Sequence, residues 1–294
     1  MKKVLAIITL FALASCTGNI TEEVPEVNNH EYTVYAVNGA DPQVKSAIDN
    51  QTSEITWTSG DAINVFFGAK SSGKFVTEES GEIAKFKGSV DIVTGGGEDT
   101  GDDSSLWGVY PYNSRNSCDG SNIILTLPAV QPAAENTFAT GLFPQIAKST
   151  NFYMSFYNLC GGFRFSVSSP DIKYVTLSGN NNESIAGSVR VSMDKTPQVE
   201  EVFAGEKTLT MYAPDGGTFK PGVNYYLVLF PTTFSKGLTL TYYKAETHAS
   251  YVVSKEYTLQ RSQFSRFADR DSGLTFVPTS LNDWGEGERV EGEI

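Results

Sequence analysis

The chain has 294 residues, and 22 basic against 34 acidic side chains give it a formal net charge of −12. That charge argues against nucleic acid as a partner and against electrostatic docking on anionic lipid. Two histidines and three cysteines are few for a metalloprotein or a thiol enzyme, so no cofactor and no metal is expected. The length exceeds that of one average domain, which favours two domains.

The N-terminus is typical of an exported protein. Two lysines precede an apolar run over residues 4–14, which is too short to stay in a bilayer as a spanning helix. The run ends in Leu13-Ala14-Ser15-Cys16, which resembles the lipobox of bacterial lipoproteins. The resemblance implies a signal peptide over residues 1–15, cleavage between Ser15 and Cys16, and lipid such as palmitate on Cys16. We therefore expect the protein to be exposed at the cell surface and anchored in the outer membrane by its lipid. The alternative is a plain signal peptide with a chance cysteine.

A tether and a first strand follow the lipobox. Residues 16–30 are polar and acidic, which predicts a flexible tether. Residues 32–37 are β-branched or aromatic apart from one alanine, and they end at the turn dipeptide Asn38-Gly39. This composition predicts a strand at residues 31–38.

Period-two alternation recurs along the rest of the chain. Apolar residues alternate with smaller or polar ones at 63–67, 188–193 and 238–243, whereas residues 223–230 are apolar on both faces apart from Asn224. Turn clusters separate such runs about every ten residues, which predicts an all-β fold of β-sandwiches. At most a short helix is expected, at 132–140. Weak patterning over 144–151 places a boundary near residue 150, so the two sandwiches are expected over 31–150 and 151–294.

The sequence contains no recognised catalytic motif, and we predict that the protein is not an enzyme. Gly-x-Ser-x-Gly, His-Glu-x-x-His and Cys-x-x-Cys are all absent. Residues 68–75 approach a P-loop, but Phe75 stands where a hydroxyl must reach Mg²⁺, so a hairpin loop is expected. The acidic, glycine-rich residues 95–103 are expected to form a solvated loop rather than a Ca²⁺ site. His248 lies in polar surroundings and is predicted to be an exposed loop residue.

Two cysteines remain once Cys16 is assigned to lipid. Export permits a disulfide between Cys118 and Cys160. Cys160 lies in an apolar stretch, however, where a buried thiol is an equally good prediction.

Five motifs occur in order along the chain. They are Trp-Thr-Ser-Gly-Asp-Ala-Ile-Asn-Val-Phe at 57–66, Tyr-Pro-Tyr at 110–112, Leu-Pro at 127–128 with Gln131, the stretch 156–165, and Pro-Gly-Val-Asn-Tyr-Tyr at 221–226 followed by Leu-Phe-Pro at 229–231. This series resembles that of the fimbrillin, or type V pilin, lipoproteins of Bacteroidetes.

The resemblance implies two transthyretin-like β-sandwich domains in tandem and assembly with other pilin subunits by strand addition. In such proteins a trypsin-like protease removes the N-terminal peptide with its first strand, and a neighbour's strand takes the vacated place. Here the removed strand would present Tyr32, Val34 and Ala36. The processing site would be Lys45-Ser46, where the family usually carries Arg. The product would be a subunit of a fimbrium or a surface adhesin.

The C-terminal residues allow two interpretations. Residues 273–294 contain Leu274, Phe276 and Trp284, which fit the strand that a stalk pilin donates to its neighbour. The same residues fit equally well the last strand of their own domain.

A second functional hypothesis is a glycan-binding outer-membrane lipoprotein of a polysaccharide-uptake system. It predicts coplanar aromatic rings on an exposed face, whereas the alternation predicts that most aromatic residues pack in cores. A glycoside hydrolase on the same scaffold requires two carboxylates in one cleft, and the sequence selects no such pair.

Overall fold

The computed structural model describes residues 27–39, 56–69, 71–93, 105–279 and 289–291. It confirms the all-β prediction, because regular structure in these ranges is β-strand apart from one short 3₁₀ turn, η1 (Pro214–Gly216). No helix in the described ranges is long and apolar enough to cross a membrane. The predicted signal peptide, Cys16 and the whole acidic loop at 95–103 lie outside these ranges.

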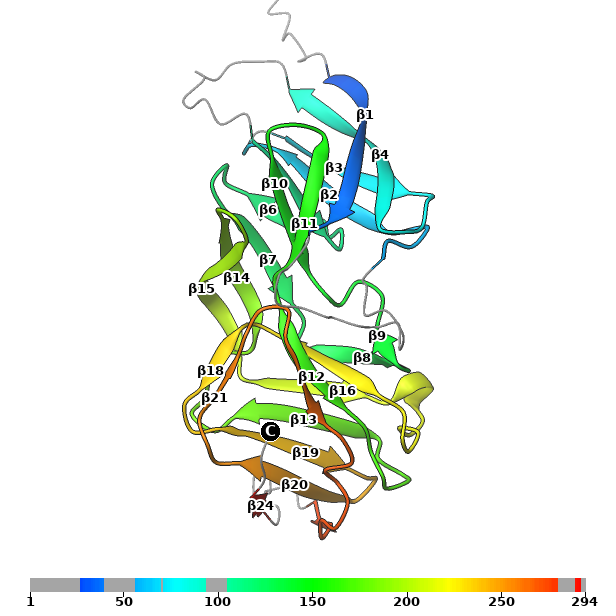
Figure 1. Cartoon of the computed structure of the whole chain (residues 1–294), viewed down its shortest axis with the longest axis vertical. Helices are drawn as coiled ribbons and strands as arrows, with labels where there is room; N and C mark the ends of the chain where they lie inside the picture. The colour runs from blue at the N-terminus through cyan, green and yellow to red at the C-terminus, as the bar shows by residue number, and fades with distance from the viewer. Residues whose placement is uncertain (1–26, 40–55, 70, 94–104, 280–288, 292–294) are drawn as a thin grey trace, which may run out of the picture.

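Seven strands close into a barrel in the upper part of Figure 1, in the order β1-β11-β10-β5-β2-β3-β4. Their bounds are β1 (Val27–Asn38), β2 (Ala62–Phe67), β3 (Ser71–Thr77), β4 (Ile83–Val93), β5 (Leu106–Tyr110), β10 (Gln145–Ser149) and β11 (Tyr153–Asn158). The predicted tether over residues 16–30 is wrong for its last four residues, which belong to β1. The first strand begins at Val27 because the long strand β4 pairs with it as far as Val93.

The other strands form four sheets. An eight-stranded sheet contains β8 (Val130–Ala134), β9 (Thr137–Phe138), β13 (Tyr174–Gly179), β16 (Thr208–Tyr212), β19 (Leu238–Tyr243), β20 (Thr247–Val253), β23 (Val277–Pro278) and β24 (Arg289–Glu291). A four-stranded sheet contains β6 (Ser117–Cys118), β7 (Ile123–Leu127), β14 (Ala186–Met193) and β15 (Pro197–Glu206). The remaining groups are β12 (Gly161–Phe165) with β17 (Tyr225–Leu229) and β22 (Phe264–Phe267), and β18 (Thr232–Phe234) with β21 (Tyr257–Leu259).

Strands that precede the predicted domain boundary at residue 150 form hydrogen-bonded ladders with strands that follow it. Strand β7 pairs with β14, and β8 pairs in parallel with β16. Figure 1 shows the result: β7 descends from the barrel towards β14 and β15, and β8 joins the lower strands. Two segments of the first half of the sequence therefore complete sheets that the second half builds.

The described residues bury two apolar cores of unequal size. The smaller core fills the barrel and consists of Val34, Ala36, Trp57, Ile63, Val65, Phe75, Ala84, Phe86, Val90, Leu106, Ala147, Met154 and Phe156. The larger core lies between the lower sheets and extends upward to Phe66, Trp107 and Ile146, which are strand residues of the barrel. The barrel wall therefore packs against both cores.

Gln131, the glutamine of the third motif, joins two sheets. It is fully buried on β8, where its side chain donates to the carbonyl of Val228 (2.6 Å) and accepts from the Val228 N–H (3.0 Å). Val228 lies on β17, so one amide side chain imitates a strand partner between β8 and β17. A buried amide needs such partners, because an unsatisfied polar group is costly in an apolar core.

Three local predictions have clear outcomes. A hairpin is confirmed at residues 68–75, but its loop is shorter than predicted, because β2 ends at Phe67 and residues 71–75 already belong to β3. Residues 225–229 are confirmed as a fully buried strand, β17. The short helix at 132–140 is wrong: β8 and β9 form a hairpin there, because β8 finds a strand partner in β16 and a side-chain bridge to β17.

Candidate functional site

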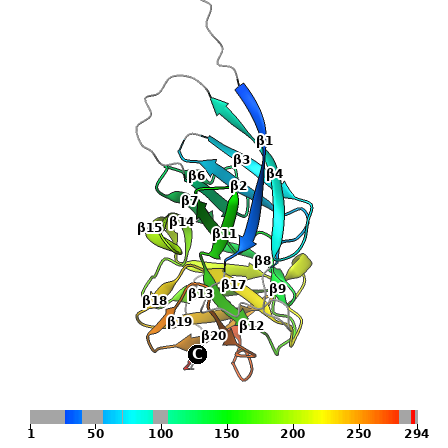
Figure 2. The same cartoon turned by 45° about the horizontal axis from the view of Figure 1, so that its top comes forward.

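The first strand, β1, pairs with a neighbour along each edge. It runs antiparallel to β4 from Val27 opposite Val93 to Val37 opposite Ile83, and parallel to β11 from Tyr35 opposite Tyr153 to Asn38 opposite Phe156. Both views of the molecule show β1 and β4 side by side (Figures 1 and 2). The strand therefore closes the barrel rather than lying at a free edge.

The alternation of β1 divides its side chains between the core and the surface. Val34 and Ala36 are fully buried in the smaller core. Tyr32 is half-buried and stacks on Phe152, with ring centroids 5.6 Å apart. The three residues singled out in the sequence thus occupy the inward positions of β1. On the outer side, Tyr35 stacks on Tyr153 at 4.8 Å and an interplanar angle of 13°.

The first motif builds the end of the barrel near β1. Trp57 is buried in the smaller core and meets Phe86 and Phe156 edge to face at 5.0 and 5.2 Å. Gly60 adopts a φ of +96°, a left-handed conformation that suits glycine. The carboxylate of Asp61 then accepts the Thr58 N–H (2.8 Å) and the Tyr110 hydroxyl (3.1 Å). The motif therefore combines a core anchor, a tight turn and a polar clamp to β5.

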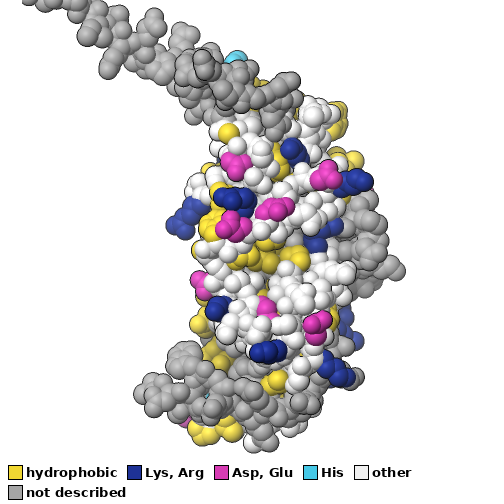
Figure 3. All heavy atoms as spheres, turned by 90° about the vertical axis from the view of Figure 1, so that its left-hand side faces the viewer, with side chains coloured by type: hydrophobic (Ala, Val, Ile, Leu, Met, Phe, Trp, Pro, Cys, Tyr) yellow, Lys and Arg dark blue, Asp and Glu magenta, His cyan; other side chains and the backbone are white. Residues whose placement is uncertain are grey.

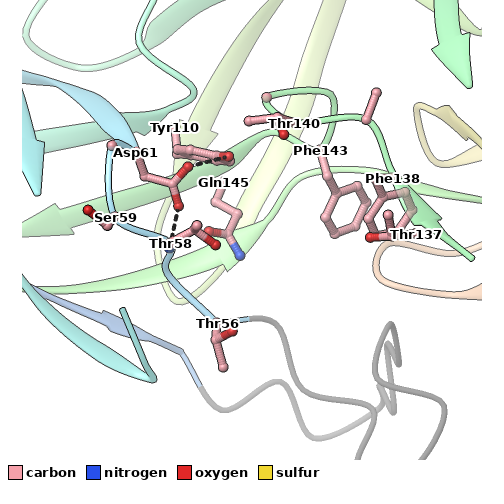
Figure 4. Close-up of a pocket in the computed structure, with 13 residues that line it drawn as sticks. Thr56, Thr58, Ser59, Asp61, Tyr110, Thr137, Phe138, Thr140, Phe143 and Gln145 are labelled. Carbon is pink, nitrogen blue, oxygen red and sulfur yellow. Dashed lines mark hydrogen bonds between the residues drawn. The ribbon is translucent and has the colours of Figure 1, made fainter. Parts of the chain in front are cut away.

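A pocket of about 640 Å³ opens beside this clamp (Figure 4). It is lined by Thr56, Thr58, Ser59, Gly60, Asp61, Tyr110, Thr137, Phe138, Ala139, Thr140, Gly141, Phe143 and Gln145. Gln145 links it to β1, since its amide donates to Asn158 Oδ1 at 2.9 Å and to Asn38 Oδ1 at 3.4 Å. Burial, followed by the charge and the hydrogen bond of Asp61, raises the pKa of Tyr110 far above its ordinary value.

The two pockets of the described residues lack the pair of carboxylates that glycoside hydrolysis requires. Asp61 is the one carboxylate in the lining of the first pocket, and Tyr110 keeps its proton at neutral pH. A second pocket of about 360 Å³, between β15, β18 and β21, has no carboxylate in its lining. Glycoside hydrolysis needs two carboxyl groups facing one bond, so neither pocket meets that requirement. The described residues also contain no group of three or more His, Cys, Asp or Glu side chains that could hold a metal ion.

The C-terminal candidate strand lies on its own chain. Leu274 and Phe276 are half-buried against the larger core, and Lys244 lies over the Phe276 ring at 4.3 Å. The next residues form β23, which pairs with β20, and the Thr279 N–H donates to the Glu246 carbonyl at 2.8 Å. Trp284 and the predicted processing site Lys45-Ser46 lie outside the described residues. Donation of the tail to a neighbour remains a prediction.

Of the two alternatives that the sequence left open for the cysteines, the structure contains no disulfide between Cys118 and Cys160, because both side chains are thiols. Cys160 is completely buried, and desolvation raises the pKa of its thiol far above the usual value. Cys118 lies on β6, where its sulfur accepts the Gly120 N–H at 3.4 Å. The buried-thiol alternative for Cys160 therefore holds.

The prediction of an exposed His248 is wrong. The residue lies on β20 and is 2% exposed. Its ring stacks on Tyr243 with centroids 5.7 Å apart, and its Nδ1 lies 3.3 Å from Thr279 Oγ1. Polar neighbours in the sequence suggested a loop, but those neighbours end the β19–β20 turn, and the histidine itself is already inside the sheet.

No family profile and no curated protein matches the chain. Among solved structures, a candidate cell adhesion protein of Bacteroides ovatus is 15% identical with a TM-score of 0.47, over 87% of this chain and 98% of that chain. A candidate cell adhesion protein of Bacteroides thetaiotaomicron is 10% identical with a TM-score of 0.40, over 90% and 97%.

The tip fimbrial protein Mfa3 of Porphyromonas gingivalis is similar over 84% of this chain and 99% of that chain, with 7% identity and a TM-score of 0.40. These three neighbours are adhesion or fimbrial proteins, the classes that the resemblance in the sequence names. Identities this low transfer no residue's role to this chain.

Proposed function

We propose that this chain is a non-enzymatic fimbrial subunit or fimbrillin-like cell-surface adhesin, exported as a lipoprotein on Cys16 and assembled by strand exchange. The observation that carries the proposal is the position of β1. It is the first described strand, it pairs with β4 and β11, and it contributes Val34 and Ala36 to the barrel core. A cut in the chain after β1 would leave that strand attached by non-covalent contacts alone.

Removal of β1 would create a site for a partner strand. The facing edges of β4 and β11 would lose their hydrogen-bond partners, and the barrel core would be opened at the places of Val34 and Ala36. Unpaired strand edges above an apolar slot are a template for strand addition. An incoming strand needs apolar side chains at alternate positions to restore both the ladder and the core.

The C-terminal segment meets this requirement in its alternation. Leu274 and Phe276 are separated by one polar residue, as Val34 and Ala36 are by Tyr35. In the described chain these two residues cover part of the larger core next to β20. Donation would therefore require them to leave that position, and β23 is bound there by a short ladder of two residue pairs.

The tandem arrangement of two transthyretin-like sandwiches is part of the same proposal. The chain has one apolar core inside the barrel and a separate one between the lower sheets, which supports a division into two units. The lack of a carboxylate pair in both described pockets supports a non-enzymatic role. If Lys45 stays uncut, the protein keeps its lipid and acts as an anchor or accessory subunit in the outer membrane.

The decisive experiment is to identify the N-terminus of the protein at the cell surface by mass spectrometry. A chain that begins at Ser46 establishes excision of β1, and Lys45→Ala should then abolish that form, whereas Lys45→Arg, which a trypsin-like protease also cuts, should preserve it. Purified appendages should contain the wild type and Lys45→Arg in detergent-resistant ladders of high mass. Monomer alone, without co-purifying subunits, contradicts the pilin proposal.

A further inference from the structure

The outward face of three neighbouring strands in the lower sheet carries an unusual set of side chains. The alternate positions of β16, β13 and β19 form three rows in register: Tyr212, Tyr174 and Tyr243; Thr210, Thr176 and Thr241; and Thr208, Ser178 and Thr239. We call these nine residues the hydroxyl face. Each of them bears a hydroxyl group, and none bears a charge.

The opposite side of the same strands shows that this face is directed outward. The intervening residues Val175 and Leu177, with their neighbours on β16 and β19, are buried in the larger core. In Figure 1, β16, β13 and β19 lie side by side, and β12 crosses them. Tyr212 is 52% exposed and Thr208 is exposed, while Thr241, nearest to β20, is nearly covered. The open part of the face therefore lies over β16 and β13.

The open part offers hydrogen-bonding groups that the described chain does not use. Thr239 donates to Asn180 Oδ1 at 2.7 Å, and Thr241 bonds to Ser250 at 2.9 Å. The hydroxyls of Thr176, Ser178, Thr208 and Thr210 have no partner within the described ranges, and they form a two-by-two block in register. Each hydroxyl can both donate and accept a hydrogen bond.

The tyrosine row bounds this block. Tyr174 stacks on Tyr243 at 4.3 Å with an interplanar angle of 8°, and on Tyr212 at 5.4 Å with an angle of 38°. These rings cover one another and present their rims and hydroxyls. Next to Tyr212, strand β8 adds the exposed residues Val130 and Pro132. The surface thus combines an apolar margin, aromatic rims and a block of unused hydroxyls.

Other faces of the molecule differ in charge. The side shown in Figure 3 carries basic and acidic side chains close together, and on β14 and β15 Arg190 pairs with Glu201 at 3.0 Å. The outer positions of β4 hold Lys85 and Lys87. Solvated strand faces usually carry such charges, which also prevent unwanted association. The hydroxyl face therefore suits a ligand that is itself uncharged, rich in hydroxyls and partly apolar.

We propose that the hydroxyl face binds a neutral polysaccharide. Sugar hydroxyls would bond to Thr176, Ser178, Thr208 and Thr210, and the C–H faces of the sugar would contact Tyr212 and the apolar margin on β8. Because no charge has to be desolvated, the binding is insensitive to salt and does not extend to polyanions. This inference deepens the proposed adhesin role by naming a ligand class, and it is tested independently of strand excision.

The test is affinity electrophoresis of the full chain in native gels that contain a soluble neutral polysaccharide (dextran, yeast mannan or galactomannan) or the polyanion alginate. At least one neutral gel should retard the protein, and alginate should not. Tyr212→Ala and Thr176→Lys should each weaken the retardation about tenfold. The matched controls Tyr153→Ala and Ser155→Lys, on exposed positions of β11, should bind like the wild type, and circular dichroism should show that all four variants fold.

Three results overturn the inference. They are the absence of retardation in every neutral gel, an equal loss of binding in the β11 controls, and self-association that Tyr212→Ala abolishes while no polysaccharide is bound. The last result would mean that the face binds a second copy of the chain. None of them bears on the N-terminus of the surface protein, so this inference and the proposed function fail separately.

Discussion

The barrel and the lower sheets bury their cores in different ways. The barrel core is small and depends on a strand at the beginning of the chain, since Val34 and Ala36 of β1 lie inside it. The lower core is larger, and none of the side chains of β1 that the structure describes, residues 30–38, belongs to it. A fold that is to release its first strand benefits from this arrangement, because the loss is confined to one core. Four substitutions test this comparison, in decreasing order of expected effect.

The largest effect is expected from Val34→Asp. A carboxylate at this fully buried position has no partner in the barrel core, so the free energy of unfolding should fall by about 5 kcal/mol. Amide hydrogen exchange should accelerate in β3 and β4 before it does in β13 and β19. The control Thr33→Asp, at a half-exposed outward position of the same strand, should cost little. Equal acceleration in both regions would show that the two cores unfold as one unit.

The next effect is expected from Phe163→Ala on β12. Phe163 is completely buried in the larger core, and its ring lies 4.9 Å from that of Phe267. The cavity and the lost contacts should lower the free energy of unfolding by about 4 kcal/mol, as measured by chemical denaturation. Here hydrogen exchange should accelerate first in β13 and β19. If the barrel strands respond first instead, the division between the cores is not the one described.

A smaller effect is expected from Gln131→Ala, which tests the link between β8 and β17. The substitution leaves the Val228 N–H and carbonyl without their side-chain partner. It should lower the free energy of unfolding by about 2 kcal/mol. Gln198→Ala, at an exposed position of β15, is the matched control and should change stability little. Equal effects of the two would mean that the bridge does not stabilise the fold.

The smallest effect at neutral pH is expected from Tyr110→Phe, which removes the hydroxyl that donates to Asp61. The loss should be about 1 kcal/mol. Folding raises the pKa of Tyr110, so its contribution is complete below the unfolded tyrosine pKa of about 10 and is lost as the pH rises above that value. Stability measured between neutral and strongly alkaline pH should fall less steeply in the variant. An unchanged slope would assign the alkaline loss to other groups.

The local pattern in the sequence was sufficient for several elements. The β-branched and aromatic composition of residues 32–37 and the alternation at residues 188–193 identified strands, and the apolar run ending at residue 230 identified a buried one. The alternation at residues 63–67 identified most of β2 in the same way. Such features depend on neighbours along the chain, which the sequence displays directly.

The errors concern neighbours in space. Residues 132–140 lack a strong strand pattern, and only the pairing of β8 with β16 and the bridge to β17 make the first part a strand. His248 was assigned to the surface because its sequence neighbours are polar, but its position on β20 buries it against Tyr243 and Thr279. Both depend on segments far away in the sequence.

The sequence alone therefore determined the all-β class, the turn positions and which residues of a strand share a face, because these follow from a repeat of two residues along the backbone. Only the tertiary structure decided which strands are neighbours. That decision put β1 between β4 and β11, and it gathered Tyr174, Thr176 and Ser178 with their partners on β16 and β19 into one uncharged face. Strand order is set by packing between distant segments, and a period-two pattern along one strand does not indicate which strands lie beside it.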